Sequence, residues 1–149
     1  MISLIPKVPG KEETRIMNVQ DIYPLSPMQK GMMFHTLYGA ENGLYVVQFM
    51  CTLGGVVAEA AFTTAWQRVF NRHAILRSGI HWEDVDDPLQ IVYGECLPTI
   101  EFLDWRNVPE GELTGVSQTF LQQDRQRGFD LTQPPLVRIH LIRLAEDRY

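Results

Sequence analysis

The residues most able to do chemistry in this 149-residue chain are its four histidines, and none has a partner at the spacing that catalysis or metal binding needs. His35 lies among Met and Phe residues of a helical pattern, which favours a hydrogen-bonded packing role over that of a base. His73 follows Arg72 at a predicted helix end, where the helix dipole favours a cation, so capping explains it as well as an active-site role does. His81 and His140 lie in strand-like stretches without a second ligand two or four positions away. The sequence therefore predicts no metal site.

Nucleophiles are equally isolated. No serine lies in a G-x-S-x-G turn, and neither Cys51 nor Cys96 has a local base. Both cysteines fall in apolar, strand-like stretches, which predicts two buried free thiols in a reducing compartment. The triplet 104–106, Asp-Trp-Arg, is explained by a surface ion pair beside a packed tryptophan. These residues alone indicate a globular domain without a visible active site.

Composition excludes several classes of protein. Hydrophobic residues make up 45% and charged residues 21%, as in ordinary globular domains. The net charge of −5 and the pI near 5.3 argue against a nucleic-acid binder, which usually presents a basic face. No apolar run approaches the roughly 20 residues that span a bilayer, and the start of the chain lacks a signal-peptide core. We therefore expect a cytoplasmic protein with no membrane or nucleic-acid partner.

The clearest structural signal is a helix start. Ser26 suits an N-cap, Pro27 suits the first helical position, and Gln29 stands where the partner in a capping box belongs. We predict a helix over 27–38. Apolar side chains ring most of its circumference, so we expect it to be largely buried.

The other elements follow from hydrophobic periodicity. Alternation predicts a long strand over 45–53, and apolar residues at helical spacing predict a helix over 58–73. Further predicted elements are strands near 77–82, 89–93, 99–103 and 136–144 and a helix over 113–128. The interleaving predicts an α/β (α+β) sandwich, in which a mixed β-sheet is covered by helices. Tyr149 would open another strand, and the exposed edge left there indicates a fragment.

Two motifs resemble a known family. The run from Tyr23 to His35, YPLSPMQKGMMFH, resembles the first core motif of the condensation domains of non-ribosomal peptide synthetases. The run from Arg72 to Arg77, RHAILR, is similar to their second motif. Further agreement in order and spacing is found at 65–67, 88–92, 104–106, 124–131 and 134–139.

The resemblance implies a fold related to chloramphenicol acetyltransferase, in which two lobes form a V. Residues 21–149 would form the N-terminal lobe, and the H-H-x-x-x-D-G motif that carries the catalytic histidine would follow them. The family joins a carrier-bound acyl or peptidyl thioester to the amine of a carrier-bound residue. Its substrates ride on phosphopantetheine arms, and no cofactor binds the domain directly. Because that motif is absent from these 149 residues, we assign no catalytic residue and expect the chain alone to be inactive.

The resemblance also gives roles to individual residues. Arg77 would pair with the aspartate of the missing motif, with His73 in support and Arg72 as the alternative. Without that carboxylate a buried arginine is costly, so we expect Arg77 to reach solvent in this chain. The form of the first motif resembles the subgroup that accepts a donor ending in a D-residue. The residues that carry this motif are Ser26, Pro27, Met28, Gln29, Gly31 and His35.

Partners and alternatives complete the expectation. Residues 1–20 read as a tail, either an inter-domain linker or a segment that docks an upstream synthetase subunit. The other implied partners are peptidyl and aminoacyl carrier proteins, the C-terminal lobe of the same domain and an adenylation domain. Two other functions stay open: a non-catalytic module that docks carriers or subunits, and an acyltransferase of the same fold that acts on free substrates.

Overall fold

Two small sheets organise the molecule. The computed structural model describes residues 18–39 and 43–149, so most of the predicted tail lies outside the described residues. In the first sheet the strand order is β1-β3-β2, all antiparallel; the strands are β1 (Val19–Pro24), β2 (Ser78–His81) and β3 (Leu89–Tyr93). In the second, β4 (Thr99–Asp104) runs parallel to β5 (Arg138–Arg143). The predicted mixture of strand directions is present, but the strands form two sheets instead of one.

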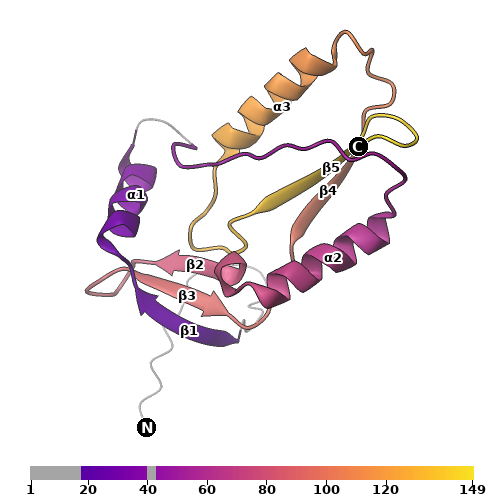
Figure 1. Cartoon of the computed structure of the whole chain (residues 1–149). Helices are drawn as coiled ribbons and strands as arrows, with labels where there is room; N and C mark the ends of the chain where they lie inside the picture. The colour runs from indigo at the N-terminus through magenta and orange to yellow at the C-terminus, as the bar shows by residue number, and fades with distance from the viewer. Residues whose placement is uncertain (1–17, 40–42) are drawn as a thin grey trace.

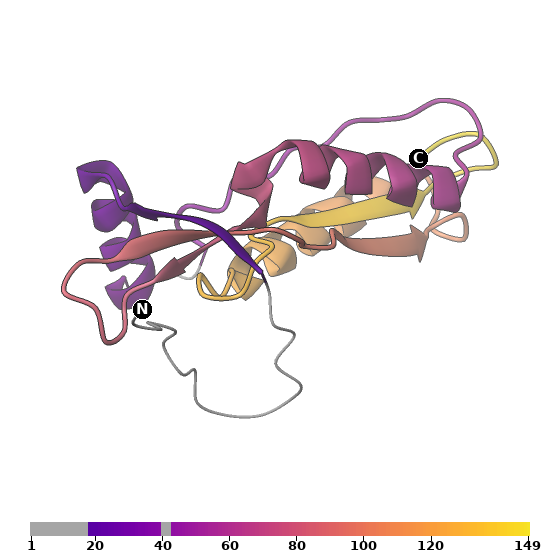
Figure 2. The same ribbon diagram turned by 90° about the horizontal axis from the view of Figure 1, so that it is seen from below.

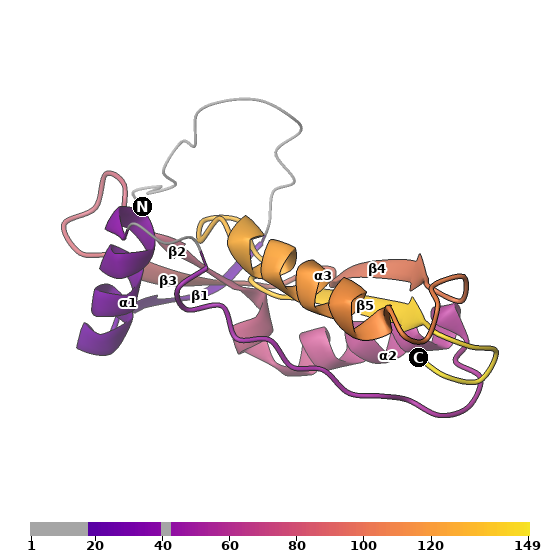
Figure 3. The ribbon, with the colours of Figure 1, turned by 90° about the horizontal axis from the view of Figure 1, so that it is seen from above.

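Helices cover the second sheet on both sides. Helix α2 (Glu59–Arg72) and helix α3 (Leu113–Arg127) lie on opposite sides of the β4–β5 pair (Figures 2 and 3). A short 3-10 turn, η1 (Ala74–Arg77), connects α2 to β2, and α1 (Pro27–Tyr38) stands at the end of the first sheet (Figure 1). No helix in the described ranges is long and apolar enough to cross a membrane.

The core is small and lies where the two sheets and α2 meet. Phe70 is fully buried on α2. Its apolar companions in the interior are Leu25, Val92, Cys96, Ile139 and Leu141. Burial of one such apolar side chain stabilises a fold by about 1.5–3 kcal/mol, so truncation of any one of them would remove a large part of the stability of this thin core.

Strand β1 was not predicted. It begins at Val19, two residues inside the segment read as a tail, and pairs with β3 from Val19↔Tyr93 to Pro24↔Leu89. All six of its side chains are exposed. Because no face of the strand is buried, its sequence carries no apolar alternation, and backbone pairing alone defines it.

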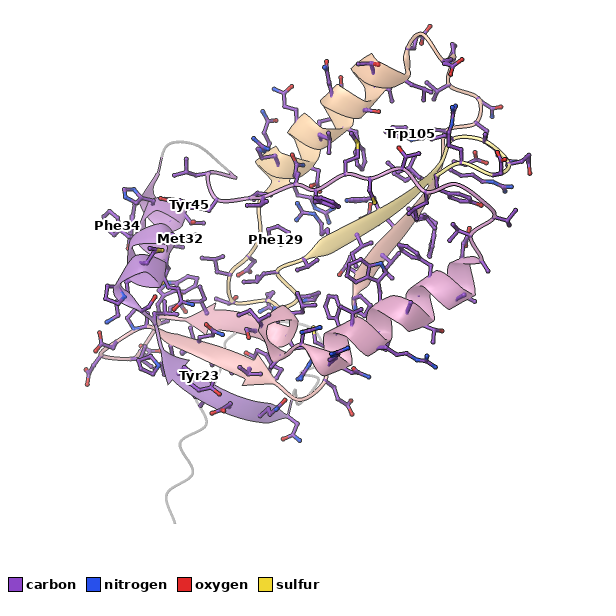
Figure 4. All side chains as sticks on the ribbon, in the orientation of Figure 1. Tyr23, Met32, Phe34, Tyr45, Trp105 and Phe129 are labelled. Carbon is purple, nitrogen blue, oxygen red and sulfur yellow. The ribbon has the colours of Figure 1, made fainter. Side chains whose placement is uncertain are left out.

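The start of α1 is confirmed, and its predicted burial is wrong. Ser26 Oγ accepts a hydrogen bond from Gln29 N (3.3 Å), and Gln29 Oε1 accepts one from Ser26 N (2.9 Å), which completes the capping box. Yet none of the helix residues is buried, and Met28 is 77% exposed. Figure 4 shows Met32 and Phe34 on this helix. No other described element covers its apolar face.

The strand predicted over 45–53 is also absent. The segment runs extended past α3 toward the C-terminus (Figure 1), but among the described residues it pairs with another segment only at its end, where Leu53 and Tyr149 exchange two backbone hydrogen bonds and Gly54 bridges Arg148. Cys51 is therefore exposed, contrary to the prediction, whereas Cys96 is buried as predicted. A strand needs a neighbour for its backbone groups, and alternation in one segment does not supply it.

Removal of the helix cap gives a first test. We expect Ser26→Ala to lower the free energy of unfolding by about 1 kcal/mol, because Gln29 N then loses its acceptor. Thr36→Ala is the matched control, since the Thr36 hydroxyl bonds only to the carbonyl of Met32 within the same helix. Denaturant midpoints decide the matter: equal shifts for the two variants would contradict the capping role.

Candidate functional site

Arg77 is the most constrained charged residue of the second motif. It stands at the end of η1 and is only 5% exposed. Its guanidinium donates hydrogen bonds to the carbonyl oxygens of Phe70 (2.9 Å), Asn71 (3.4 Å), Gly94 (3.2 Å) and Tyr93 and to the side chain of Gln20 (2.9 Å).

The expectation that Arg77 reaches solvent is therefore wrong. Neutral oxygens satisfy the guanidinium in place of a carboxylate, and they come from the C-terminal turn of α2, the end of β3 and strand β1. The positive charge of Arg77 also affects the nearby Cys96 thiol. Burial raises the pKa of the Cys96 thiol above its ordinary value, and the positive charge of Arg77 offsets part of that rise.

The two residues at the start of the second motif, Arg72 and His73, face outward. Arg72 ends α2 and His73 separates α2 from η1, and both side chains are exposed. The backbone N–H of His73 donates to Val69 O (3.0 Å), and the carbonyl of His73 accepts from Leu76 N (3.1 Å). His73 therefore shapes the turn through its backbone, and Arg72 does not occupy the buried position.

A chain of side-chain hydrogen bonds connects the first motif to the second. Gln29 Nε2 donates to Gln90 Oε1 (2.9 Å), and Gln90 Nε2 donates to Ser78 Oγ (3.3 Å). Ser78 Oγ in turn donates to the carbonyl of Ala74 (3.2 Å). The start of α1 is thus attached through β3 to the residue that follows Arg77. The sequence assigned Gln29 to the motif but gave no sign of Gln90 as its partner.

Three other residues of the first motif, Pro27, Gly31 and His35, are open to solvent. His35 is exposed, with its ring 6.5 Å from that of Tyr45, and Figure 4 shows Tyr45 close to α1. A Cβ atom added to Gly31 would meet nothing within 4 Å. Pro27 is exposed at the first position of the helix. In the described part of the chain, no hydrogen bond or ion pair joins His35 to the second motif.

A half-buried ionic cluster connects α3 to the second sheet, and sequence reasoning missed it. Arg138 Nε donates to Asp124 Oδ1 (2.8 Å), with the two side chains 9% and 15% exposed. His140 lies between two carboxylates: its Nε2 is 3.5 Å from Asp124 Oδ1 and its Nδ1 is 3.3 Å from Glu101 Oε2. These partners come from β4 and α3, so a search at two or four positions along the chain could not find them.

Electrostatics hold Asp124 in its charged form. Burial disfavours the carboxylate, but hydrogen bonds from Arg138 and Gln48 and the positive charge of Arg138 outweigh it, so the pKa of Asp124 lies below its ordinary value. The described residues contain no group of three His, Cys, Asp or Glu side chains that could hold a metal ion. On this geometry the cluster binds α3 to β5 and offers no open coordination position.

The ion pair predicted at the end of β4 is present. The Arg106 side chain donates three hydrogen bonds to the Asp104 carboxylate, the shortest of 2.7 Å, and both side chains are exposed. Hydrogen bonds from Arg106 lower the pKa of Asp104 to about 2. Trp105 packs edge to face on Phe120 of α3, with ring centroids 5.5 Å apart. The triplet therefore anchors α3 at the far end of the sheet, away from the two motifs.

Comparison with known proteins extends these observations. The sequence model of the family described as "Condensation domain" matches residues 19–149. Among curated relatives, the chain is 47% identical over 126 residues to a linear gramicidin synthase protein of Brevibacillus parabrevis and 39% identical over 131 residues to bacitracin synthase 3 of Bacillus licheniformis. These matches cover 85% and 88% of this chain but only 2% of each relative.

Solved structures share the fold. The four-domain non-ribosomal peptide synthetase holo-AB3403 superposes with a TM-score of 0.70 at 24% identity, over 89% of this chain and 10% of that one. The starter condensation domain of rhizomide synthetase RzmA gives a TM-score of 0.70 at 21% identity, over 87% of this chain and 32% of that one. The two motifs of the sequence and the arrangement of the elements thus point in the same direction.

Proposed function

Because this chain belongs to the condensation-domain family, we propose that it is the N-terminal portion of a domain that joins a carrier-bound acyl or peptidyl thioester to the amine of a carrier-bound aminoacyl residue. The observation that carries this proposal is the family match over residues 19–149, which includes both motifs. The bond that forms is an amide, the bond that breaks is the thioester, and the proton of the amine leaves with the released thiolate.

The reaction depends more on positioning of the two substrates than on activation of the amine nucleophile. An amine is a good nucleophile and a thiolate leaves readily, whereas two tethered substrates must be held in line. Such positioning can be equivalent to an effective molarity of roughly 10⁵ M or more. The described residues suit that task, because Arg77 and the Gln29–Gln90–Ser78 chain fix the two motifs on one sheet.

The proposal includes the partners that such a reaction requires. Phosphopantetheine arms of carrier proteins would deliver both substrates, an adenylation domain would load them, and a second lobe would supply the H-H-x-x-x-D-G motif. Within this chain, Arg77 would hold the fold beside that motif, with no part in proton transfer. We place the reaction in the cytoplasm, and the first motif favours a donor that ends in a D-residue.

A graft tests the proposal. Residues 18–149 of this chain would replace the matching segment of a condensation domain in the linear gramicidin synthase protein to which it is 47% identical. With loaded donor and acceptor carriers, mass spectrometry should detect the dipeptidyl carrier, and a D-donor should react faster than its L-epimer. The control graft carries alanine in place of the second histidine of the host's H-H-x-x-x-D-G motif. A folded graft that forms no product would favour a non-catalytic docking module.

The 149-residue chain alone should form no product above the spontaneous rate. Its histidines lie apart: His35 and His73 are exposed, and His140 faces two carboxylates in the ionic cluster. The same carrier assay measures this, with the graft as the positive control. Turnover by the isolated chain on carriers would contradict the assignment, and turnover on free acyl and amine substrates would indicate the other acyltransferase class.

A further inference from the structure

Helix α1 has few contacts that could hold it at a fixed angle. None of its residues is buried, whereas Leu25, just before the helix, is 4% exposed. Beyond its own cap, α1 forms two side-chain hydrogen bonds to other segments in the part of the chain that the structure describes. Gln29 Nε2 donates to Gln90 Oε1 (2.9 Å), and Lys30 Nζ donates to Asp87 Oδ1 (2.6 Å). Leu25 therefore anchors the base of the helix, and these two bonds resist a pivot about that base.

The two bonds differ in how firmly they can hold the helix. The side chains of Lys30 and Asp87 are 39% and 70% exposed, and an exposed ion pair of this kind contributes little because solvent screens it. Asp87 also lies in the turn between β2 and β3. Gln90 is half-buried on β3, the middle strand of its sheet, where it lies opposite Tyr23 of β1 and Ile80 of β2. Only the bond to Gln90 thus has a rigid base.

The hydrogen bonds around Gln90 all run in one direction. Because Gln29 Oε1 accepts from Ser26 N (2.9 Å), the Nε2 of Gln29 is the group that faces Gln90. Gln90 Oε1 accepts that bond, and Gln90 Nε2 donates to Ser78 Oγ (3.3 Å). Ser78 is 6% exposed and donates its hydroxyl proton to Ala74 O (3.2 Å), at the start of η1. Each donor therefore points from α1 toward η1, and bonds arranged in this way polarise and strengthen one another.

We propose that Gln90 is the positioning residue of the first motif: it fixes the angle of α1 against the sheet and couples that angle to η1, which carries Arg77. Gln90 acts through Gln29 on one side and through Ser78 on the other. The consequence for the reaction rests on the proposed function. A loose first motif would let bound substrates leave their alignment, which lowers turnover more than binding.

Residual dipolar couplings of the 149-residue chain test the positioning directly. In the parent, the backbone N–H couplings of α1 should fit the same alignment tensor as those of β1, β2 and β3. Gln90→Met keeps the length of the side chain without its polar groups. It should reduce the α1 couplings at least about twofold and leave those of the sheet unchanged, because the helix gains motion relative to the sheet. Gln133→Met is the matched control, because the exposed Gln133 amide bonds locally, to the adjacent Thr132 (3.4 Å).

A conservative variant separates the hydrogen bond from packing. Gln90→Glu still accepts from Gln29 Nε2 but cannot donate to Ser78, so it should restore the α1 couplings to the parent values. Unchanged α1 couplings in Gln90→Met would overturn the proposal. A Gln90→Glu variant as loose as Gln90→Met would show that packing holds the helix, which also overturns it. So would a loss of α1 couplings in Lys30→Met that Gln90→Met does not reproduce.

The graft described above gives the functional readout. In the active graft, we expect Gln90→Met to lower kcat at least about tenfold while the KM values for both loaded carriers change less than about twofold, because alignment is lost and carrier binding is kept. Gln133→Met should leave both parameters unchanged, and Gln90→Glu should recover most of kcat. An active graft in which Gln90→Met keeps its kcat would overturn the role of Gln90 in the reaction. A parent graft without activity would count against the proposed function alone, since the dipolar couplings decide the positioning without it.

Discussion

Arg77→Ala is expected to lower the free energy of unfolding of this chain by about 3 kcal/mol, the largest effect that we predict for a single substitution. The Arg77 side chain is 5% exposed and donates to five oxygens of Gln20, Phe70, Asn71, Tyr93 and Gly94. Truncation would leave buried carbonyl groups without a donor and open a cavity in a thin core. Urea denaturation followed by circular dichroism measures the loss.

Two matched variants make the test specific. Arg72→Ala removes the same charge from an exposed position five residues earlier, and it should change the free energy of unfolding by no more than about 0.5 kcal/mol. Arg77→Lys keeps the charge but lacks the planar fork that reaches several acceptors, so it should recover less than half of the loss. An Arg77→Ala midpoint equal to that of Arg72→Ala would show that the buried contacts contribute nothing measurable.

This result would change how the second motif is understood. The resemblance gives Arg77 an aspartate partner from the H-H-x-x-x-D-G motif, so the sequence predicted an unpaired, solvent-exposed arginine in this chain. The structure instead satisfies Arg77 within residues 20–94. In the active graft we therefore expect Arg77→Ala to lose activity and stability together. If the Arg77→Ala graft lost activity but kept its stability, Arg77 would have a direct role in the active site.

Elements with hydrophobic periodicity or a clear start signal were predictable from the sequence. Strand β3 was predicted at the residues where it lies, and the ends of α3 and β4 differ from the prediction by one residue. Each has an apolar face or a clear start signal. Strand β1 has neither, and the segment 45–53 has alternation but, among the described residues, pairs with another segment only at Leu53. Period-2 alternation reports how side chains are distributed, whereas strand formation also depends on a partner that can come from anywhere in the sequence.

The contacts of the site were harder to predict from the sequence than its motifs were. The acceptors of Arg77 are mostly backbone carbonyls, which every residue type provides, so no residue letter marks them. Asp124 and Arg138 lie in two stretches that the resemblance had singled out, but their pairing depends on how α3 packs against β5. A motif therefore located the right segments, and only the packing revealed which side chains meet.

The ion pair of Asp124 and Arg138 should be the second most sensitive point of the fold. We expect Asp124→Asn to lower the free energy of unfolding by roughly 2 kcal/mol at pH 7, since hydrogen bonds to charged groups contribute about 1.5–3 kcal/mol. The change keeps the size of the side chain but weakens its bonds to Arg138 (2.8 Å) and Gln48 (3.2 Å). Asp147→Asn removes the same charge at an exposed site and is the control, with an expected change below about 0.5 kcal/mol.

The same pair makes the stability depend on pH in a defined direction. The pKa of Asp124 in the folded chain lies below its ordinary value, because the bonds from Arg138 and Gln48 outweigh the effect of burial. The stabilisation is therefore fully present above the unfolded-state pKa of about 3.9 and is lost as the pH falls through the lower folded-state value. The difference in unfolding free energy between the parent and Asp124→Asn should stay constant from about pH 8 to pH 5 and shrink below about pH 4. Urea titrations at each pH measure this difference. A difference that grows on acidification would mean that Asp124 is protonated in the folded chain. Arg138 would then be held by the backbone carbonyls of Asp124 and Gly128 alone.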